Sequence, residues 1–438
     1  MGAADVAFAR GTRQASRMLA SALGLAMFGL VGAAQGQAVH PRSHLDFNFS
    51  NPGARSLGFG GAFAPLADDA TAAFANPAGL VQLVRPEVSL EARGWSSSAA
   101  FAAGGRFDGT PTGLGIDTRP GLLLAHESTS EAGPSFASAI WPRGRWTLAL
   151  YAHELARADS FTESQGLFLG SGGFVREPAS RDRAKLRLHT FGLAAGWRAN
   201  DRWSFGLALV RFDLSFTARS ELYGADPNRP ESSYEPIPYT PDRLLGIGTM
   251  SIEGSDTTVS SGLLFTPHER VSIGLFLRPG ASMTANAEVT RSGAPGRWPP
   301  VDDVTNVPSA AGAGLAWRSP SGRLTLAGQL DYLAYRGFLG SLVENFLGLH
   351  SRGNPEARPY QSAWEGHFGG EYALLSRRPV VAFRAGAWVD EHSGDLEHDR
   401  VLHMAGGVGV AGERLQVDLG ADVSSVLDTV SLSVIYSF

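Results

Sequence analysis

The connections between the predicted strands constrain this chain more than any other feature, because short and long connections alternate along it. Hydrophobic residues alternate with small or polar residues, the pattern of strands with two unlike faces. The strands are predicted near residues 87–105, 134–141, 145–156, 185–198, 202–219, 256–267, 270–290, 309–318, 322–336, 362–375, 379–390, 400–411, 414–424 and 428–438. Tight turns are predicted at 142–144, 199–201, 267–269, 319–321, 376–378 and 412–413. Long loops are predicted at about 106–133, 157–184, 220–255, 291–308 and 337–361.

Short turns at one end of the strands and long loops at the other are typical of a transmembrane β-barrel. A soluble sandwich has no reason to sort its connections in this way. The pattern therefore predicts an all-β fold, a transmembrane antiparallel barrel of about 14 strands with an apolar outer face and a polar inner face. A secreted soluble β protein is the alternative.

The composition excludes several other classes of protein. The chain has 438 residues, with 54 glycines, no cysteine and a formal net charge of −5. A chain without cysteine has no disulfide scaffold and no thiolate zinc site. The net negative charge, without a basic run, argues against a nucleic-acid partner. Beyond the N-terminus no run of about 18 apolar residues occurs, which excludes a bundle of membrane helices.

The N-terminus predicts secretion. Arg10, Arg13 and Arg17 precede an apolar segment at 18–34, and small residues follow it. This order is that of a secretory signal peptide, which we place at residues 1–38. An uncleaved membrane anchor is the alternative.

The last strand predicts the compartment. Residues 429–438 alternate, with Val430, Leu432, Val434 and Tyr436 on one face, and the chain ends in Phe438. A final strand with a terminal aromatic residue resembles the signal by which outer-membrane barrels are recognised for assembly. That resemblance implies the cell outer membrane as the location, outer-membrane lipid as the surroundings, and the barrel-assembly machinery as a partner through Phe438.

The segment before the first strand does not alternate, and residues 53–83 resemble the N-terminal region of the FadL/TodX-type transporters of hydrocarbons and long-chain fatty acids. The matching residues are Gly58, Gly60, Gly61, Asp68, Asp69, Asn76, Pro77, Ala78 and Gly79. The resemblance implies a small plug, or hatch, at residues 39–86 inside a barrel at residues 87–438. It also implies passive uptake of hydrophobic small molecules such as long-chain fatty acids, with no cofactor. Similar openings occur in PorV-type secretion-associated barrels, so a barrel with a protein partner is the alternative.

The residues of this segment also predict its local structure. Residues 69–74 are alanine-rich and favour a short helix, which Asp68 or Asp69 could cap. Pro77 would end that helix, and Asn76 is expected to be extended because it precedes a proline. An ordinary helix and turn without a role in transport explains the same residues.

Charged residues on the predicted inner face are the candidate ligand contacts. These residues are Arg93, Lys185, Arg187, His189, His367 and Arg384. Opposite charges inside a barrel most often form a structural network that holds the plug, although one or two cations could bind a carboxylate head group. No catalytic motif and no metal site is predicted, so an enzyme is not expected. A lipid hydrolase with its site at the rim is the remaining alternative.

One strand carries an irregularity. The apolar set of residues 202–219 changes parity between Leu209 and Val210. Such a change turns the faces over unless a bulge absorbs it. In the resembling family a kinked strand makes a gap in the wall through which the ligand leaves, so we expect a bulge at this position. A bulge where the strand leaves the membrane is the alternative.

Overall fold

The computed structural model describes residues 51–170, 175–291, 301–334, 362–376, 378–390 and 400–438. The predicted signal peptide at 1–38 and the first part of the predicted plug lie outside these ranges. The strands are β1 (Glu87–Gly105), β2 (Leu122–Arg143), β3 (Trp146–Ser164), β4 (Phe168–Leu169), β5 (Val175–Arg176), β6 (Ala179–Arg198), β7 (Trp203–Tyr223), β8 (Leu244–His268), β9 (Val271–Arg278), β10 (Ser282–Arg291), β11 (Val301–Asn306), β12 (Ser309–Arg318), β13 (Leu324–Ala334), β14 (Ala363–Leu374), β15 (Val380–Asp390), β16 (Val401–Ala411), β17 (Leu415–Val423) and β18 (Leu427–Ser437).

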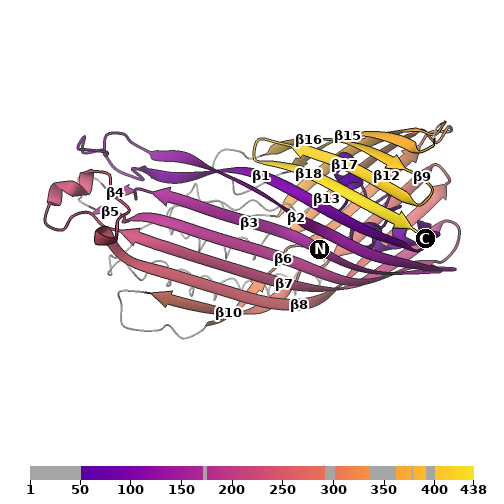
Figure 1. Ribbon diagram of the computed structural model, residues 1–438, viewed down its shortest axis with the longest axis horizontal. Coiled ribbons are helices and arrows are strands. Elements are labelled where there is room, and N and C mark those ends of the chain that lie inside the picture. Colours follow the sequence, from indigo (N-terminus) through magenta and orange to yellow (C-terminus); the bar gives the residue numbers. More distant parts are fainter. Residues whose placement is uncertain (1–50, 171–174, 292–300, 335–361, 377, 391–399) are drawn as a thin grey trace, which may run out of the picture.

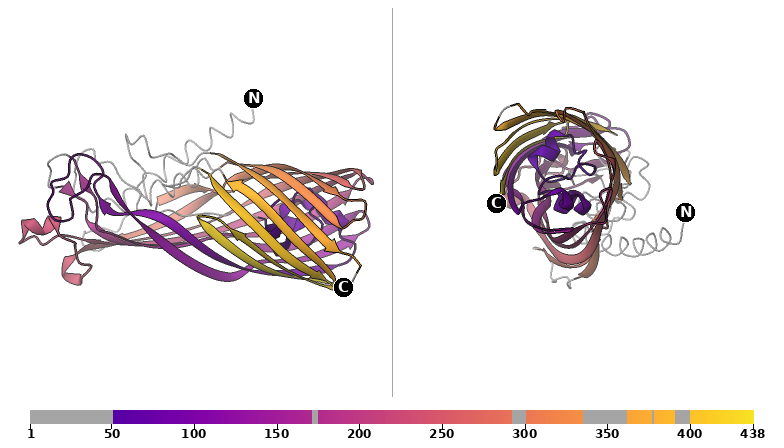
Figure 2. Two further views of the ribbon diagram at one scale, coloured as in Figure 1. Left: turned by 90° about the horizontal axis from the view of Figure 1, so that it is seen from above. Right: turned by 90° about the vertical axis from the view of Figure 1, so that its right-hand side faces the viewer.

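Fourteen strands form a closed antiparallel ring. Going round it, β8 pairs with β7, followed by β6, β3, β2, β1, β18, β17, β16, β15, β14, β13, β12 and β9. The pairing of β9 with β8 closes the ring, while β10 and β11 extend the sheet beyond it. The predicted barrel is therefore confirmed. Figure 2 shows the ring end-on, with the first described residues inside it.

The outer face of the barrel is apolar. Along β18, Val430, Leu432 and Val434 are exposed, whereas Ser431 and Ser433 between them are buried. Aromatic side chains pack on one another near the short turns, among them Trp203 against Phe265. An apolar band with aromatic residues at its edge is the surface that a bilayer requires. In the described ranges no helix combines the length and the apolar character needed to cross a membrane.

The strands on one side of the ring are longer than predicted. The strand predicted at 134–141 is β2, which begins at Leu122, and the strand predicted at 256–267 is β8, which begins at Leu244. These strands continue into the predicted long loops, and the wall from β1 to β8 extends well past the yellow strands in Figure 1. The predicted loop boundaries were wrong because, in these extensions, polar side chains replace apolar ones on the outer face. The alternation that marks a membrane strand is therefore lost, although the pairing between strands continues.

The predicted bulge at Leu209 and Val210 was wrong. β7 pairs with β6 and with β8 through this region without a shift of register. Leu209 still points outward and Val210 inward, in line with the residues before them. The apolar residues of β7 change parity because the surroundings of its outer face and of its inner face both change at this point. Beyond Leu209 the outer face becomes polar, beginning with Arg211, and the inner face becomes apolar, beginning with Val210.

Candidate functional site

Residues 51–86, here called the luminal segment, pack against the inner wall at the short-turn end of the barrel. The segment holds α2 (Ala54–Gly58), α3 (Ala72–Ala75) and the 3-10 helix η1 (Pro77–Gln82). Its apolar side chains Phe59, Phe63, Leu66 and Leu80 are all at most 1% exposed. Figure 2 shows these helices within the ring of strands.

Wall glycines make room for η1. A Cβ on Gly206 of β7 would overlap the backbone of Pro77 and Ala78, and one on Gly262 of β8 would overlap the side chain of Asn76. In the segment itself, a Cβ on Gly79 would overlap Ala67. The backbones of the segment and the wall approach each other closely because these positions carry no side chain.

The other motif glycines lie at the turn after α2. Gly58 contacts the wall, since a Cβ on it would lie 3.3 Å from Gly407 Cα and from Arg384 Cβ. Gly60 and Gly61 have φ angles of 62° and 80°, in the left-handed region that side chains disfavour. A Cβ on Gly61 would also lie 2.8 Å from Nδ1 of His367. This turn therefore brings the backbone against β14 and β15.

Asn76 joins the segment to the wall. Its side-chain amide donates to the carbonyls of Ala64 at 3.0 Å and of Leu263 in β8 at 3.2 Å. Its Oδ1 accepts from the N–H of Ala78. The extended conformation predicted for Asn76 is confirmed, with φ of −157° and ψ of 99°, and Pro77 begins η1.

The predicted cap of the helix was wrong. α3 begins at Ala72 rather than at residue 69, and no side chain of the described residues caps it. Asp69 instead accepts hydrogen bonds from the N–H and the hydroxyl of Thr71. Asp68 pairs with Arg55 at 2.5 Å and with Arg318 at 2.6 Å. Both carboxylates are committed to neighbours because the helix starts too late for either to reach its first turn.

Arg93 and Arg384 face the lumen, as predicted, but both are engaged by carboxylates. Arg93 bonds to Glu91 at 2.8 Å and donates to the carbonyl of Asn51. Arg384 bonds to Glu371 and to Asp418, each at 2.7 Å. Glu371 also accepts from Arg55 of the luminal segment. These contacts form an ion-pair network that ties the segment to the wall.

Lys185, Arg187 and His189 do not face the lumen, which corrects the predicted orientation. They share the outward parity of Phe191 in β6, while Leu186 and Leu188 point inward and are 0% exposed. Outside the barrel they pair with carboxylates: Lys185 with Asp159, Arg187 with Glu131, and His189 with Glu154. The parity was misassigned because this part of β6 lies beyond the apolar band, where the apolar residues are the inner ones.

The upper lumen, between the luminal segment and the long loops, is therefore apolar and not polar as predicted. Its inner-face residues belong to one buried apolar cluster, which includes Leu186, Leu188, Val210, Phe212, Leu214, Phe216, Met250, Ile252 and Met283. Phe74 of α3 belongs to the same cluster. The barrel thus has a polar wall around the luminal segment and an apolar wall above it.

A small apolar cavity lies where the two parts meet. Its lining includes Phe74, Tyr151, Val210, Phe212 and Arg278. The guanidinium of Arg278 lies over the rings of Phe74 at 4.6 Å and Phe276 at 4.4 Å. Within the described residues Arg278 forms no ion pair and no hydrogen bond. Arg278 lies on the polar parity of residues 270–290, and the following Pro279 and Gly280 mark a break in the strand.

The strand predicted at 270–290 is in fact interrupted beside this cavity. β9 ends at Arg278 and β10 begins at Ser282, while β11 and β12 are likewise separated at Val307 and Pro308. On this side, the pairing of β8 stops at Glu253 and resumes at Ser261. Side chains bridge part of the interval, as Asp256 accepts from the N–H of Ser282. The cavity reaches the interruption, since Ser260, Pro279 and Pro308 line it.

A buried salt bridge orders the loop between β1 and β2. Arg106 bonds to both carboxylate oxygens of Asp117, at 2.9 and 2.6 Å, and the two residues are at most 1% exposed. Thr112 donates to the same carboxylate through its N–H and its hydroxyl. The hydrogen bond from Arg106 is the largest cause that lowers the pKa of Asp117 to about 2.

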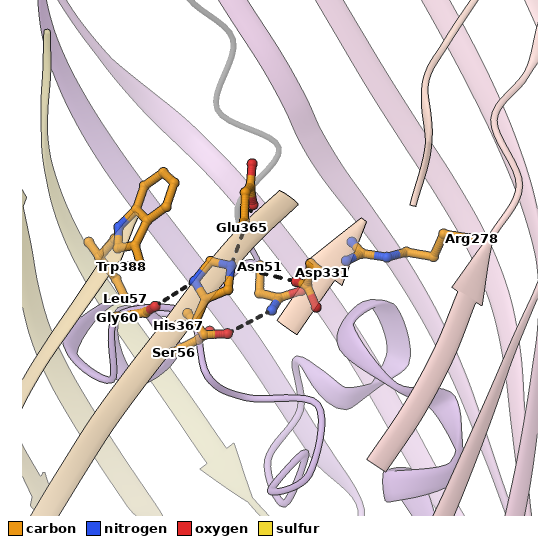
Figure 3. A pocket seen from close by; sticks show the side chains of 10 residues that line it. Asn51, Ser56, Leu57, Gly60, Arg278, Asp331, Glu365, His367 and Trp388 are labelled. Carbon is orange, nitrogen blue, oxygen red and sulfur yellow. Dashed lines mark hydrogen bonds and ion pairs between the residues drawn. The ribbon is translucent and has the colours of Figure 1, made fainter. Parts of the chain in front are cut away.

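His367 faces the lumen, as predicted, and lies in a second, polar cavity against the luminal segment. Its Nδ1 lies 2.8 Å from the carbonyl oxygen of Gly60. Its Nε2 lies 3.4 Å from Glu365 Oε2 and 3.6 Å from Asp331 Oδ2 (Figure 3). Glu365 shares the parity of His367 along β14, and Asp331 lies opposite Glu365 on the neighbouring strand β13.

Comparison with known proteins supports the fold. No family model and no curated protein matches the chain. Among solved structures, a Pseudomonas aeruginosa FadL homologue is 15% identical with a TM-score of 0.55, and the match covers 92% of this chain and 100% of that one. The Ralstonia pickettii toluene transporter TbuX is 13% identical with a TM-score of 0.57, covering 89% and 99%. The CymD monoaromatic hydrocarbon channel is 14% identical with a TM-score of 0.55, covering 90% and 99%. The chain therefore shares the fold of the FadL-type and TodX-type outer-membrane barrels.

Proposed function

We propose that the protein is an outer-membrane channel for the passive uptake of hydrophobic small molecules, including long-chain fatty acids. The observation that carries the proposal is the apolar upper lumen. Apolar side chains on the inner face of a membrane barrel have no role in contact with lipid, and an aqueous pore would line this wall with polar groups. Burial of a hydrocarbon chain there contributes about 0.8 kcal/mol per methylene group.

Arg278 supports an acid as one class of ligand. It stands at the lower end of the apolar wall, and no carboxylate of the described residues lies within ion-pair distance of it. A carboxylate head group could accept hydrogen bonds from this guanidinium while its chain extends along the apolar wall. Arg93 and Arg384 are less suited to this role because carboxylates of the protein already engage them.

The luminal segment would act as the plug. Phe74 forms part of the cavity wall, so a shift of α3 would open the cavity toward the lower lumen. The interruption between β8 and β9–β10 offers a second path, sideways into the bilayer. This location replaces the one that the sequence predicted in β7. Recognition of Phe438 by the barrel-assembly machinery is part of the same proposal.

Uptake of a labelled long-chain acid and of a labelled alkane tests the proposal. Cells with the wild-type protein should take up both compounds faster than cells without it. An Asn76→Ala, Pro77→Ala variant should change the rate for both, because it loosens the plug. Unchanged uptake after complete deletion of the protein would exclude a transport role and leave a barrel with a protein partner as the alternative.

The ligand class is tested separately at Arg278. Arg278→Gln should weaken binding of the acid by about tenfold or more, with little effect on the alkane, because only the acid loses a charge-assisted hydrogen bond. Arg211→Gln is the matched control, since Arg211 lies outside the barrel and pairs with Asp213. Equal weakening of both ligands would show that Arg278 acts only through packing.

A further inference from the structure

Three side chains that commonly bind metals converge on one point of the inner wall. Asp331 lies on β13, and Glu365 and His367 lie on β14. The antiparallel register places Asp331 directly opposite Glu365. One nitrogen and two carboxylate oxygens from these residues all lie within 4.8 Å of one another.

The imidazole of His367 is oriented as in a metal site. A carbonyl oxygen can only accept, so Nδ1 donates its proton to Gly60, and in the neutral ring Nε2 carries a free lone pair. The ring is stacked on Trp388, with 5.4 Å between centroids. Among the described residues Nε2 has no hydrogen-bond partner, although the side chain is only 8% exposed. Metal-binding histidines almost always donate their other N–H in this way.

The distances from His367 Nε2 to the two carboxylates are long for hydrogen bonds but suit ligands that share a small ion. Nε2 lies 3.4 Å from Glu365 Oε2 and 3.6 Å from Asp331 Oδ2. Zinc binds nitrogen and oxygen at about 2.0–2.1 Å, so neighbouring ligands of a tetrahedral ion lie roughly 3.3 Å apart. To bind an ion between the three atoms, the distances from Nε2 to Glu365 Oε2 and to Asp331 Oδ2 would need to shorten by only a few tenths of an ångström.

A second layer of contacts holds Asp331. The amide of Gln329 donates to both of its carboxylate oxygens, at 3.0 and 2.8 Å. The side-chain Oε1 of Gln329 in turn accepts from the N–H of Ala64 in the luminal segment. Such outer contacts fix the direction of ligating carboxylates.

The adjoining cavity has room for an ion and unsatisfied polar atoms around it. Its volume is about 20 Å³, enough for one ion or one water molecule. Asn51 and Ser56 of the luminal segment line it, and Asn51 Oδ1 and Ser56 Oγ are buried without a hydrogen-bond partner in the part of the chain that the structure describes. Figure 3 shows Asn51 beside Asp331 and His367. Either oxygen could complete the coordination of an ion.

We propose that Asp331, Glu365 and His367 bind a divalent transition-metal ion, with zinc best matched to the donors. One imidazole with two carboxylates suits zinc, whereas calcium takes six to eight oxygens and magnesium keeps most of its water. Arg278 lines the same cavity and points toward Asp331, but it forms no ion pair there within the described residues. Neither carboxylate is therefore engaged by Arg278.

The site would join the luminal segment to the barrel wall. Gly60 holds His367, Ala64 holds Asp331 through Gln329, and Asn51 borders the cavity. A bound ion would draw β13 and β14 toward these contacts. Metal binding is therefore expected to stabilise the folded protein, because the ion binds the assembled site and not its separated ligands.

Titration of the full-length, chelator-treated protein in detergent tests the proposal. Zinc should bind at a stoichiometry of one, and zinc at 100 times its Kd should raise the unfolding midpoint. Cobalt should give the intense visible absorption of a tetrahedral site. Glu365→Gln and His367→Gln should each weaken zinc binding at least tenfold and abolish both effects.

His189→Gln is the matched control, because His189 lies 3.4 Å from Glu154 on the outer face and pairs with no second carboxylate of the described ranges. This variant should bind zinc as the wild type does. Asp331→Asn is a third ligand variant, which keeps the test valid if one of the others fails to fold. Absence of zinc and cobalt binding in the wild type, or equal binding in the folded ligand variants, would overturn the site. Binding of calcium but not zinc would overturn the assignment to a transition metal.

Discussion

The side-chain amide of Asn76 donates to the main-chain carbonyl of Leu263, at 3.2 Å, and so joins the luminal segment directly to the barrel wall. Asn76 is 0% exposed, and the same amide also satisfies the carbonyl of Ala64. The contact requires the glycine at position 262, because a side chain there would occupy the place of the Asn76 amide. The attachment of the luminal segment at this point therefore depends both on the amide of Asn76 and on the absence of a side chain at Gly262.

Asn76→Ala should loosen the luminal segment. The substitution leaves two buried carbonyls without this donor, which costs about 1–3 kcal/mol for each group left unsatisfied. Hydrogen exchange of the amides in 72–83 should become faster, while exchange in β18 should not change. Asn228→Ala in an exposed loop is the control. Equal protection of 72–83 in the two variants would show that packing alone holds the segment.

Gly206→Ala should destabilise the protein through overpacking. The new methyl group would overlap Pro77 and Ala78, and such insertions cost about 1–3 kcal/mol. Gly366→Ala is matched to it, since Gly366 is also in a strand and a Cβ there meets nothing within 4 Å. Denaturant unfolding in detergent should separate the two variants. Similar unfolding midpoints for the two variants would mean that the luminal segment shifts to accommodate the methyl group without loss of stability.

Arg384→Gln should break the ion-pair network. Arg384 is 7% exposed and joins Glu371 to Asp418, so its loss leaves buried carboxylates uncompensated, at a cost of about 3–5 kcal/mol. Arg378→Gln removes an exposed pair with Glu413, where about 0–1 kcal/mol is expected. The free energies of unfolding of the two variants, measured side by side, check this difference. Equal losses would contradict the buried network.

The loop between β1 and β2 should open in acid. The pKa of Asp117 is about 2 in the folded loop, below the ordinary value of 3.8. The stabilisation by its charge is complete above the ordinary value and is lost as the pH falls through about 2. Proteolysis of 106–121 by an acid-stable protease should therefore increase between pH 4 and pH 2. In Asp117→Asn the loop should be open throughout this range, and an unchanged pH profile would refute the role of the carboxylate.

Ser260→Trp should slow uptake if ligands leave through the interruption of the wall. Ser260 lines the apolar cavity and is 6% exposed, so an indole there would fill the path. Leu263→Trp, on the outward face of the same strand, adds the same group on the lipid side. Uptake of a labelled alkane by cells with equal amounts of each variant measures the effect. Equal rates would place the path elsewhere, and unfolding midpoints would identify any loss of folded barrel.

The candidate site was predictable only in part. Alternation placed Arg93, His367 and Arg384 on the inner face, because parity within one strand is a local property. It failed for Lys185, Arg187 and His189, because the rule that apolar means outward holds only inside the bilayer. Above the bilayer the outer face meets water and the inner face can be apolar, and the sequence of one strand does not show where that change occurs.

The sequence by itself determined the barrel. Three features indicate strands that cross a bilayer and return, and each can be read along the chain. They are the alternation of apolar and polar residues, the short turns that alternate with long loops, and the aromatic residue at the end of the last strand. The tertiary structure decided what lies inside. Three relationships depend on register and on the packing of the luminal segment. They are the convergence of Asp331, Glu365 and His367, the position of Arg278 at the end of an interrupted strand, and the attachment of Asn76 to Leu263. These relationships join residues far apart in the chain, so no local pattern records them.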